Sequence, residues 1–205
     1  MTMKYGILSL GMLLLALTSL QAQTRFGVTG GVHLAHISTN DADINDEKRA
    51  MPGYQLGIVT DVPLGKGGGW SFQNRILFQL KGTGISHGDH TDKIRFNSLD
   101  LPISLHYQSK SGFFVAGGPN LGFNLAASEK ADAGVEKLEL GSEPGQLNRT
   151  DFGLDLRAGM RLKSGLIIGL NYLRGLSNIQ NTPNMTWNNH VFGLQVGYFF
   201  AAKGK

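Results

Sequence analysis

The stretch from Trp187 to Phe200 alternates two kinds of side chain at a period of two. His190, Phe192, Leu194, Val196, Tyr198 and Phe200 share one face, and Asn189, Val191, Gly193, Gln195, Gly197 and Phe199 share the other. A period of two is the geometry of a β-strand, whose successive side chains point to opposite faces of a sheet. The first face is an apolar wall and the second is mostly small or polar, so this strand separates two environments.

The same rhythm recurs in seven earlier segments, which predicts eight strands. We expect them near residues 25–37, 53–63, 69–83, 93–107, 112–125, 149–162, 165–177 and 187–200. The connections at 64–68, 108–111 and 163–164 are short, whereas those at 38–52, 84–92, 126–148 and 178–186 are long and polar. Outer-membrane barrels have short periplasmic turns and long outer loops, with an even number of strands. The pattern predicts an all-β, eight-stranded antiparallel up-and-down transmembrane β-barrel.

The N-terminus is typical of an exported protein. Lys4 precedes an apolar block at 7–17, and Leu20-Gln21-Ala22 is a site where signal peptidase can cut. We therefore expect a signal peptide at 1–22, a single barrel domain at 23–205 and residence in the outer membrane. No later run of ~18 apolar residues predicts a spanning helix, so any membrane crossing falls to strands.

Composition narrows the function classes. The chain has no cysteine, which excludes disulfides, thiolate metal sites and cysteine nucleophiles. The formal net charge is +4, and the basic residues are dispersed along the strands, which argues against nucleic-acid binding. Mean hydropathy is -0.10 because outward apolar residues and inward polar residues cancel.

Charged side chains fall on the face that we assign to the barrel lumen. In segment 149–162, Phe152 and Leu154 share one face, while Asp155 and Arg157 share the other. The full predicted lumen network is Arg25, Asp61, Arg75, Lys81, Arg95, Asp100, Asp151, Asp155, Arg157 and Arg161. Side chains nearly fill the interior of an eight-stranded barrel. We therefore expect a plugged set of paired charges, and expect Asp155→Ala to destabilise the barrel by leaving arginines unpaired.

Two strands are irregular. In 69–83, placing Arg75, Gln79 and Lys81 in the lumen puts Asn74 on the lipid side. In 93–107 the apolar face slips by one residue between Phe96 and Leu99, which a β-bulge would explain. That interpretation puts Ile94 and Phe96 on the lipid face and Arg95 in the lumen.

Aromatic residues gather toward the strand ends, where an interfacial girdle is found in membrane barrels. They are Trp70, Phe72, Tyr107, Phe113, Tyr198 and Phe200 toward the periplasmic end, and Tyr54, Phe123, Phe152, Tyr172 and Trp187 toward the outer end. The terminal Tyr198-Phe199-Phe200 also resembles the final strand by which barrel-assembly machinery recognises its clients.

Two stretches carry a resemblance to a known family. The residues of Ser98–Tyr107, followed by Phe114–Gly122, resemble a signature of the PorT-like outer-membrane β-barrel proteins of Bacteroidota, and the likeness continues through Gly159–Ile179 to Gly197–Phe200. The resemblance implies an eight-stranded outer-membrane barrel. The namesake branch is associated with secretion of exported proteins, and no catalytic residue comes with the signature.

Candidate reactive groups are few. His87, Asp89 and His90 could bind a divalent metal if a fourth ligand approached. His36 and Ser38 share a strand face, with Asp41 or Asp43 nearby, and could form a base and nucleophile for lipid modification. His33 and His36 lie three residues apart, so they point to opposite faces. In each case we expect a structural role, a solvated hairpin tip for the first group and a strand end for the second, with no catalytic residue, metal or cofactor.

The predicted role is therefore structural or interactive. The polar loop 126–148, in which Leu138 and Leu140 alternate with charges, is expected to extend its strands above the membrane and to contact a protein partner. Outer-membrane lipid and the assembly machinery are the other expected partners, and the barrel is expected to be a monomer. Two rivals stay open: a soluble lipocalin-like barrel with an apolar interior, and an outer-membrane lipid-modifying enzyme.

Overall fold

The computed structural model describes residues 24–65, 69–87, 90–131 and 134–200. The expected signal peptide lies outside the described residues. The elements are β1 (Arg25–Thr39), α2 (Ala42–Glu47), β2 (Lys48–Arg49), β3 (Met51–Pro63), β4 (Trp70–His87), β5 (His90–Gln108), β6 (Phe113–Ala131), β7 (Gly134–Leu138), β8 (Thr150–Arg161), β9 (Leu166–Gly175) and β10 (Trp187–Phe199).

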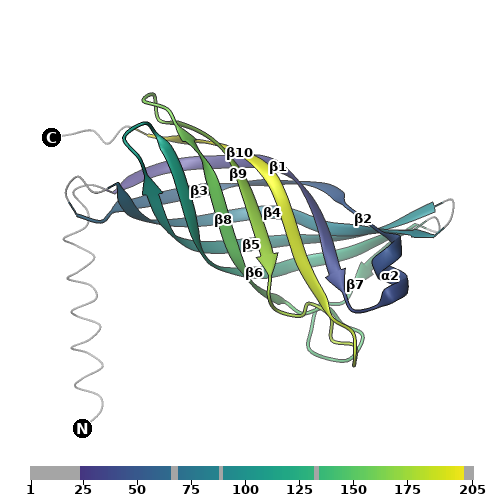
Figure 1. Cartoon of the computed structure of the whole chain (residues 1–205). Helices are drawn as coiled ribbons and strands as arrows, with labels where there is room; N and C mark the ends of the chain where they lie inside the picture. Colours follow the sequence, from purple (N-terminus) through teal and green to yellow (C-terminus); the bar gives the residue numbers. More distant parts are fainter. Residues whose placement is uncertain (1–23, 66–68, 88–89, 132–133, 201–205) are drawn as a thin grey trace, which may run out of the picture.

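The long strands close into a barrel (Figure 1). Each pairs antiparallel with the next along the chain, in the order β1, β3, β4, β5, β6, β8, β9 and β10. The ring closes because β10 pairs with β1 over a register that runs from Gly27 opposite Phe199 to Thr39 opposite Trp187. The predicted eight-stranded up-and-down architecture is thus confirmed, with β2 and β7 as short additions at one end. No helix in the described ranges has the length and apolarity needed to cross a membrane.

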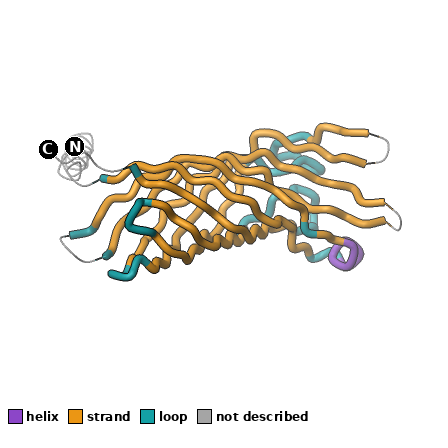
Figure 2. The backbone as a smooth tube through the Cα atoms, turned by 90° about the horizontal axis from the view of Figure 1, so that it is seen from above, coloured by secondary structure: helices purple, strands orange, loops and turns teal. Residues whose placement is uncertain are grey.

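The connections sort by length to the two ends of the barrel. Three short connections have backbone hydrogen bonds of 2.8 Å at their ends, from Leu64 to Trp70, from Ser109 to Phe113 and from Leu162 to Leu166. We call this the short-turn end, and the opposite one the long-loop end. There the β4–β5 and β6–β7 hairpins run out beyond the rest of the barrel, on the same side as α2 (Figure 2).

These hairpins are more regular than the sequence indicated. The predicted loop 84–92 is nearly all strand, since β4 and β5 stay paired up to His87 opposite His90. The predicted loop 126–148 begins as the upper part of β6 and continues into β7, as its alternation suggested. The predicted loop 38–52 contains the short strand β2 and the helix α2, and the helix was not expected. Asp41 caps that helix, because its Oδ1 accepts a hydrogen bond from the Ile44 backbone N–H at 3.2 Å.

The barrel is apolar outside and polar inside. Along β10, Leu194 is 58% exposed whereas its neighbour Gln195 is 3% exposed. Charged side chains such as Lys81 and Asp155 are buried in the interior, while large apolar side chains cover the outer surface. A lipocalin-like barrel has the reverse polarity, so the structure contradicts that rival.

The irregularity in β5 is resolved differently from the prediction. The pairing does shift between Asn97 and Ser98, but the extra residue is Leu125 of β6, because Ser98 pairs with Asn124 and Asn97 with Ala126. Strand β5 keeps its alternation through the shift. Ile94 and Phe96 therefore point inward and are buried, and Arg95 is exposed on the outside. The predicted lumen position of Arg95 was wrong, as was the predicted lipid exposure of Ile94 and Phe96.

Candidate functional site

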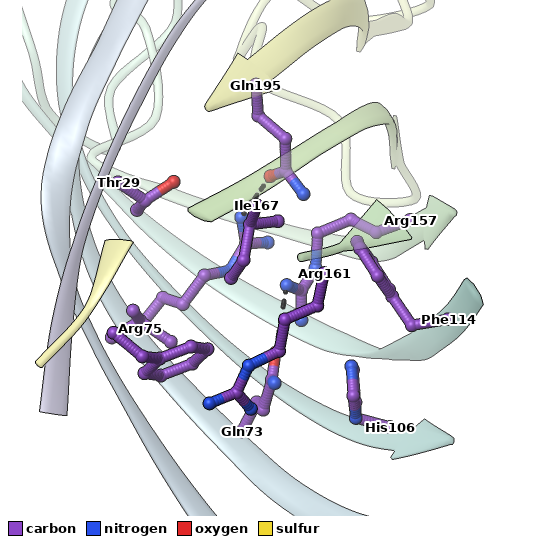
Figure 3. Close-up of a pocket in the computed structure, with 11 residues that line it drawn as sticks. Thr29, Gln73, Arg75, His106, Phe114, Arg157, Arg161, Ile167 and Gln195 are labelled. Carbon is purple, nitrogen blue, oxygen red and sulfur yellow. Dashed lines mark hydrogen bonds between the residues drawn. The ribbon is translucent and has the colours of Figure 1, made fainter. Parts of the chain in front are cut away.

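The middle of the lumen is built around Asp155 of β8. Its Oδ2 lies 2.6 Å from Nη2 of Arg75 and 3.1 Å from Nε of Arg157. The two guanidinium groups also donate to amides from other strands, Arg75 to Gln195 at 3.4 Å and Arg157 to Gln73 at 3.1 Å (Figure 3). Strands that are distant in the sequence are thereby joined across the barrel interior.

A second cluster surrounds Lys81 of β4. Its ammonium is fully buried and lies 3.1 Å from Asp100 Oδ1 and 3.4 Å from Asp151 Oδ2. Neutral side chains complete the coordination of the two carboxylates: Ser98 and Asn120 donate to Asp100, and Asn189 donates to Asp151. Buried charges are tolerated when they are paired and hydrogen-bonded in this way.

The third cluster lies at the short-turn end. Asp61 is fully buried and forms ion pairs with Arg25 and with Arg161, whose Nη1 is 3.7 Å from Asp61 Oδ2. The Arg161 guanidinium also lies over the Phe199 ring, 4.5 Å from its centroid, a cation–π contact. Nine of the ten predicted lumen charges thus fall into three paired clusters, and Arg95 is the one placed outside.

Little space remains between these clusters. The cavity shown in Figure 3, lined by Gln73, Arg75, His106 and Arg157 among others, has a volume of about 20 Å³. That is room for about one water molecule. A wider hollow of about 370 Å³ opens at the short-turn end, where Arg25, Lys110, Arg161 and Lys163 are among its lining residues.

An apolar plug fills the lumen at the long-loop end, and sequence reasoning missed it. The plug consists of Ile37, Ile85, Ile94, Phe96, Ala127, Leu147, Ile179 and Trp187, with Ile44, Leu138 and Leu140 packed against it. Trp187 is 6% exposed, so its predicted place in the outer aromatic girdle was wrong. Its inward position could have been read from the alternation of β10, in which residue 187 shares parity with Asn189.

The outer surface carries a histidine cluster near the long-loop end. His190 stacks on His36 with ring centroids 5.1 Å apart. Its Nε2 is 3.2 Å from the Ser38 hydroxyl, and its Nδ1 is 3.0 Å from the Tyr172 hydroxyl. Ser38 therefore hydrogen-bonds with His190, whereas the sequence predicts a pair of Ser38 with His36. His33 lies on the opposite face of β1, as predicted, where its Nε2 is 2.9 Å from the Leu80 carbonyl oxygen.

The other acids near Ser38 do not complete a triad. Asp41 is occupied as the cap of α2, and the side chain of Asp43 lies outside what the structure describes. Within the described ranges, no three His, Cys, Asp or Glu side chains are grouped to hold a metal ion. The predicted His87, Asp89 and His90 site lies largely outside these ranges, since residues 88–89 and the His87 side chain are not described.

The long-loop end presents a sheet edge beyond the barrel. Strand β6 pairs with β8 only up to Phe123 opposite Thr150. Above that point β7 takes the place of β8, pairing with β6 from Ala127 opposite Leu138 to Ala131 opposite Gly134. Among the described residues β7 pairs only with β6, and Val135 is 70% exposed.

Comparisons with known proteins agree with this architecture. The family model described as "Outer membrane protein beta-barrel domain" matches residues 21–181. No curated protein matches the sequence.

Three solved structures are similar to this chain. Ail, the attachment invasion locus protein of Yersinia pestis, is 12% identical, with a TM-score of 0.47 over 87% of this chain and 99% of that one. Neisserial surface protein A is 13% identical, with a TM-score of 0.49 over 85% and 97%. OprG from Pseudomonas aeruginosa is 14% identical, with a TM-score of 0.47 over 88% and 98%. Because the identities are this low and the TM-scores stay below 0.5, no function is carried over from these proteins.

Proposed function

We propose a function from the premise that this chain belongs to the outer membrane protein beta-barrel domain family. In this proposal the chain is a non-enzymatic barrel of the outer membrane, and its long-loop end binds a protein partner at the cell surface. The short turns then face the periplasm, which is the usual orientation of such barrels.

The observation that carries this proposal is the edge of β7. An unpaired strand edge offers backbone N–H and C=O groups to an incoming strand, which is a common way for proteins to bind extended segments. The exposed Val135 supplies an apolar contact beside that edge, and Glu136 and Lys137 supply charge. The closed lumen below gives the partner no path through the barrel, so binding would occur on the outside.

Site-specific photo-cross-linking in intact host cells tests this role. A photoreactive residue at Val135 or Lys137 is expected to give a discrete adduct, whereas one at Lys163, in a turn at the opposite end, is not. Lys137→Pro should abolish the adduct at 135, because proline on an edge disrupts strand pairing. The folding control is the gel mobility of unheated and heated samples, since a folded barrel resists detergent until it is heated; this heat-dependent gel shift should be retained in the variant. Equal adducts at 135 and 163, or an adduct unaffected by the proline, would contradict the proposal.

A second candidate is modification of a membrane lipid, favoured by the Ser38–His190–Tyr172 chain of hydrogen bonds. The chain has the order of nucleophile, base and orienting group that acyl transfer requires. It lacks an acid among the described neighbours, so we rank it second. Mass spectra of host lipids should be identical for Ser38→Ala and wild type if the barrel is non-enzymatic, and an altered acylation pattern would favour the enzyme.

The narrower PorT-like assignment, with a role in protein secretion, is a proposal supported by the resemblance of Ser98–Tyr107 and Phe114–Gly122 alone. In the structure these residues contribute to strand pairing. Pro102 of β5 lies opposite Asn120 of β6, and Gly118 of β6 allows the backbone of β5 to approach closely at Ile103. We also propose that Tyr198–Phe200 is read by barrel-assembly machinery and that the barrel is monomeric. Retention of a secreted reporter in a deletion strain, restored by the intact gene, would support the secretion role.

A further inference from the structure

Four cations share the outward face of the sheet that extends beyond the barrel. Lys93 of β5 lies directly opposite Lys130 of β6, and one step nearer the barrel Arg95 lies opposite Ser128, which in turn lies opposite Lys137 of β7. Residues directly opposite in an antiparallel sheet share one face. All four are exposed, and none of their side chains makes a hydrogen bond or ion pair to another described side chain. We call Lys93, Arg95, Lys130 and Lys137 the basic face.

The acids of the same strands lie on the other face. Glu129 is opposite Glu136 and adjacent to the buried Ile94, and Asp92 is opposite the buried Ile85. Strand alternation therefore separates the signs of charge, with cations outward and acids toward the side above the lumen. Like charges opposite one another destabilise a sheet, so the Lys93–Lys130 pair is unfavourable unless an anion lies between the two ammonium groups.

The basic face continues the surface that contacts lipid. Below it, the outward positions of β5 and β6 carry exposed apolar side chains, among them Ile103, Leu121 and Leu125. Ser128, the partner of Arg95, is three residues beyond Leu125, about 10 Å along an extended strand. Cations at that distance from the hydrocarbon lie at the level of lipid headgroups.

We propose that the basic face binds the phosphate groups of phosphorylated lipid headgroups in the leaflet at the long-loop end, and so holds the protruding sheet against the membrane. Arginine and lysine are the usual partners of phosphate, Arg95 through a planar fork and the lysines as point charges. The inference rests on the membrane placement of the barrel, and substitutions confined to β5 and β6 test it without changing β7. Continuity with the lipid-facing surface favours a headgroup over free phosphate as the source.

The experiment uses the full-length mature protein refolded in phosphatidylcholine nanodiscs that contain a minor fraction of either bisphosphorylated lipid A or fully dephosphorylated lipid A. Native mass spectrometry counts the lipid A molecules that stay bound after release. The test variant is Lys93→Gln/Arg95→Gln/Lys130→Gln. The matched control is Glu129→Gln/Glu136→Gln, which changes the opposite face of the same hairpins. Inorganic phosphate is added as a competitor in a separate arm.

Wild type and the control variant should retain bisphosphorylated lipid A, the triple variant should retain at least tenfold less, and dephosphorylated lipid A should not be enriched. Equal retention of the two lipids by wild type would overturn the proposal, as would an equal loss in the control variant. Displacement by stoichiometric inorganic phosphate would show a free-phosphate site and overturn the lipid source. If the triple variant loses its heat-dependent gel shift, the comparison of the two lipids on wild type decides alone.

Discussion

At the scale of single residues, the lumen depends on complete pairing. Lys81 is entirely buried and has two carboxylates within 3.4 Å, and Asp155 joins two guanidinium groups that themselves reach Gln73 and Gln195. Removing both members of a buried ion pair can be nearly neutral, whereas removing one leaves a charge without its counterion. Single substitutions in these clusters therefore test how much the ion pairs contribute to the stability of the barrel.

Replacing Asp155 with alanine should destabilise the barrel by about 3–5 kcal/mol, because Arg75 and Arg157 would then be buried together without an anion. Urea unfolding in detergent micelles, followed by tryptophan fluorescence, measures the change in free energy of unfolding. Asp46→Ala on the exposed face of α2 is the control and should change it by less than about 0.5 kcal/mol. Equal stability of Asp155→Ala and wild type would show that the cluster does not hold the strands together.

Gly118→Ala tests whether a single hydrogen atom is required where β6 meets β5. A Cβ at position 118 would lie 2.0 Å from the Ile103 carbonyl oxygen, a backbone atom that cannot move alone. We expect a loss of about 1–3 kcal/mol, as for other overpacked sites. Gly30→Ala is the matched control, since its nearest neighbours would lie at 3.4 and 3.5 Å. The same unfolding assay compares the two, and an equal effect would rule out the close approach as the cause.

At the scale of elements, the sequence predicts the strands well, except for the parts of the strands at the long-loop end. Alternation places Arg75, Gln79 and Lys81 inward and Asn74 outward, as observed. It fails at Ile94 and Phe96 because the lumen changes from polar to apolar at the plug, so an apolar side chain no longer indicates the lipid face. The shift in pairing was placed at the right residues of β5, but only the register shows that Leu125 of β6 is the extra residue.

Deleting Leu125 should therefore leave the faces of β6 beyond the bulge unchanged. Asn124 already pairs with Ser98 and Ala126 with Asn97, so removal of the extra residue gives one regular register in which Ala127 stays inward and Ser128 stays outward. The chain has no cysteine, so single cysteines at 127 and 128 report their faces through labelling by a membrane-impermeant maleimide. Position 128 should label and position 127 should not, both in the parent barrel and in the deletion variant. A reversed labelling pattern in the deletion variant would mean that Leu125 is not the extra residue of the bulge.

At the scale of the whole molecule, the lumen has two seals in series. The paired charges fill the middle and the apolar plug fills the long-loop end. The first seal could be predicted from the sequence, because charges recur at the inward positions of several strands. The second could not, because Leu147 and Ile179 come from loops whose positions only the closed barrel brings together with Phe96. The same holds for Ser38 with His190, which are 152 residues apart.

Because the seals are independent, opening one should not make a channel. Phe96→Ala/Trp187→Ala removes two large side chains from the plug, and Arg157→Gln removes a charge from the middle of the lumen; each is expected to leave the other seal intact. In planar lipid bilayers, wild type and both variants should give no unitary current steps under conditions in which a general porin, used as the positive control, conducts. An eight-stranded barrel has an interior just wide enough for its own side chains, which is the physical reason for this expectation. Regular current steps in the plug variant would show that the charged clusters leave a continuous water path, and steps in Arg157→Gln would show the same of the plug.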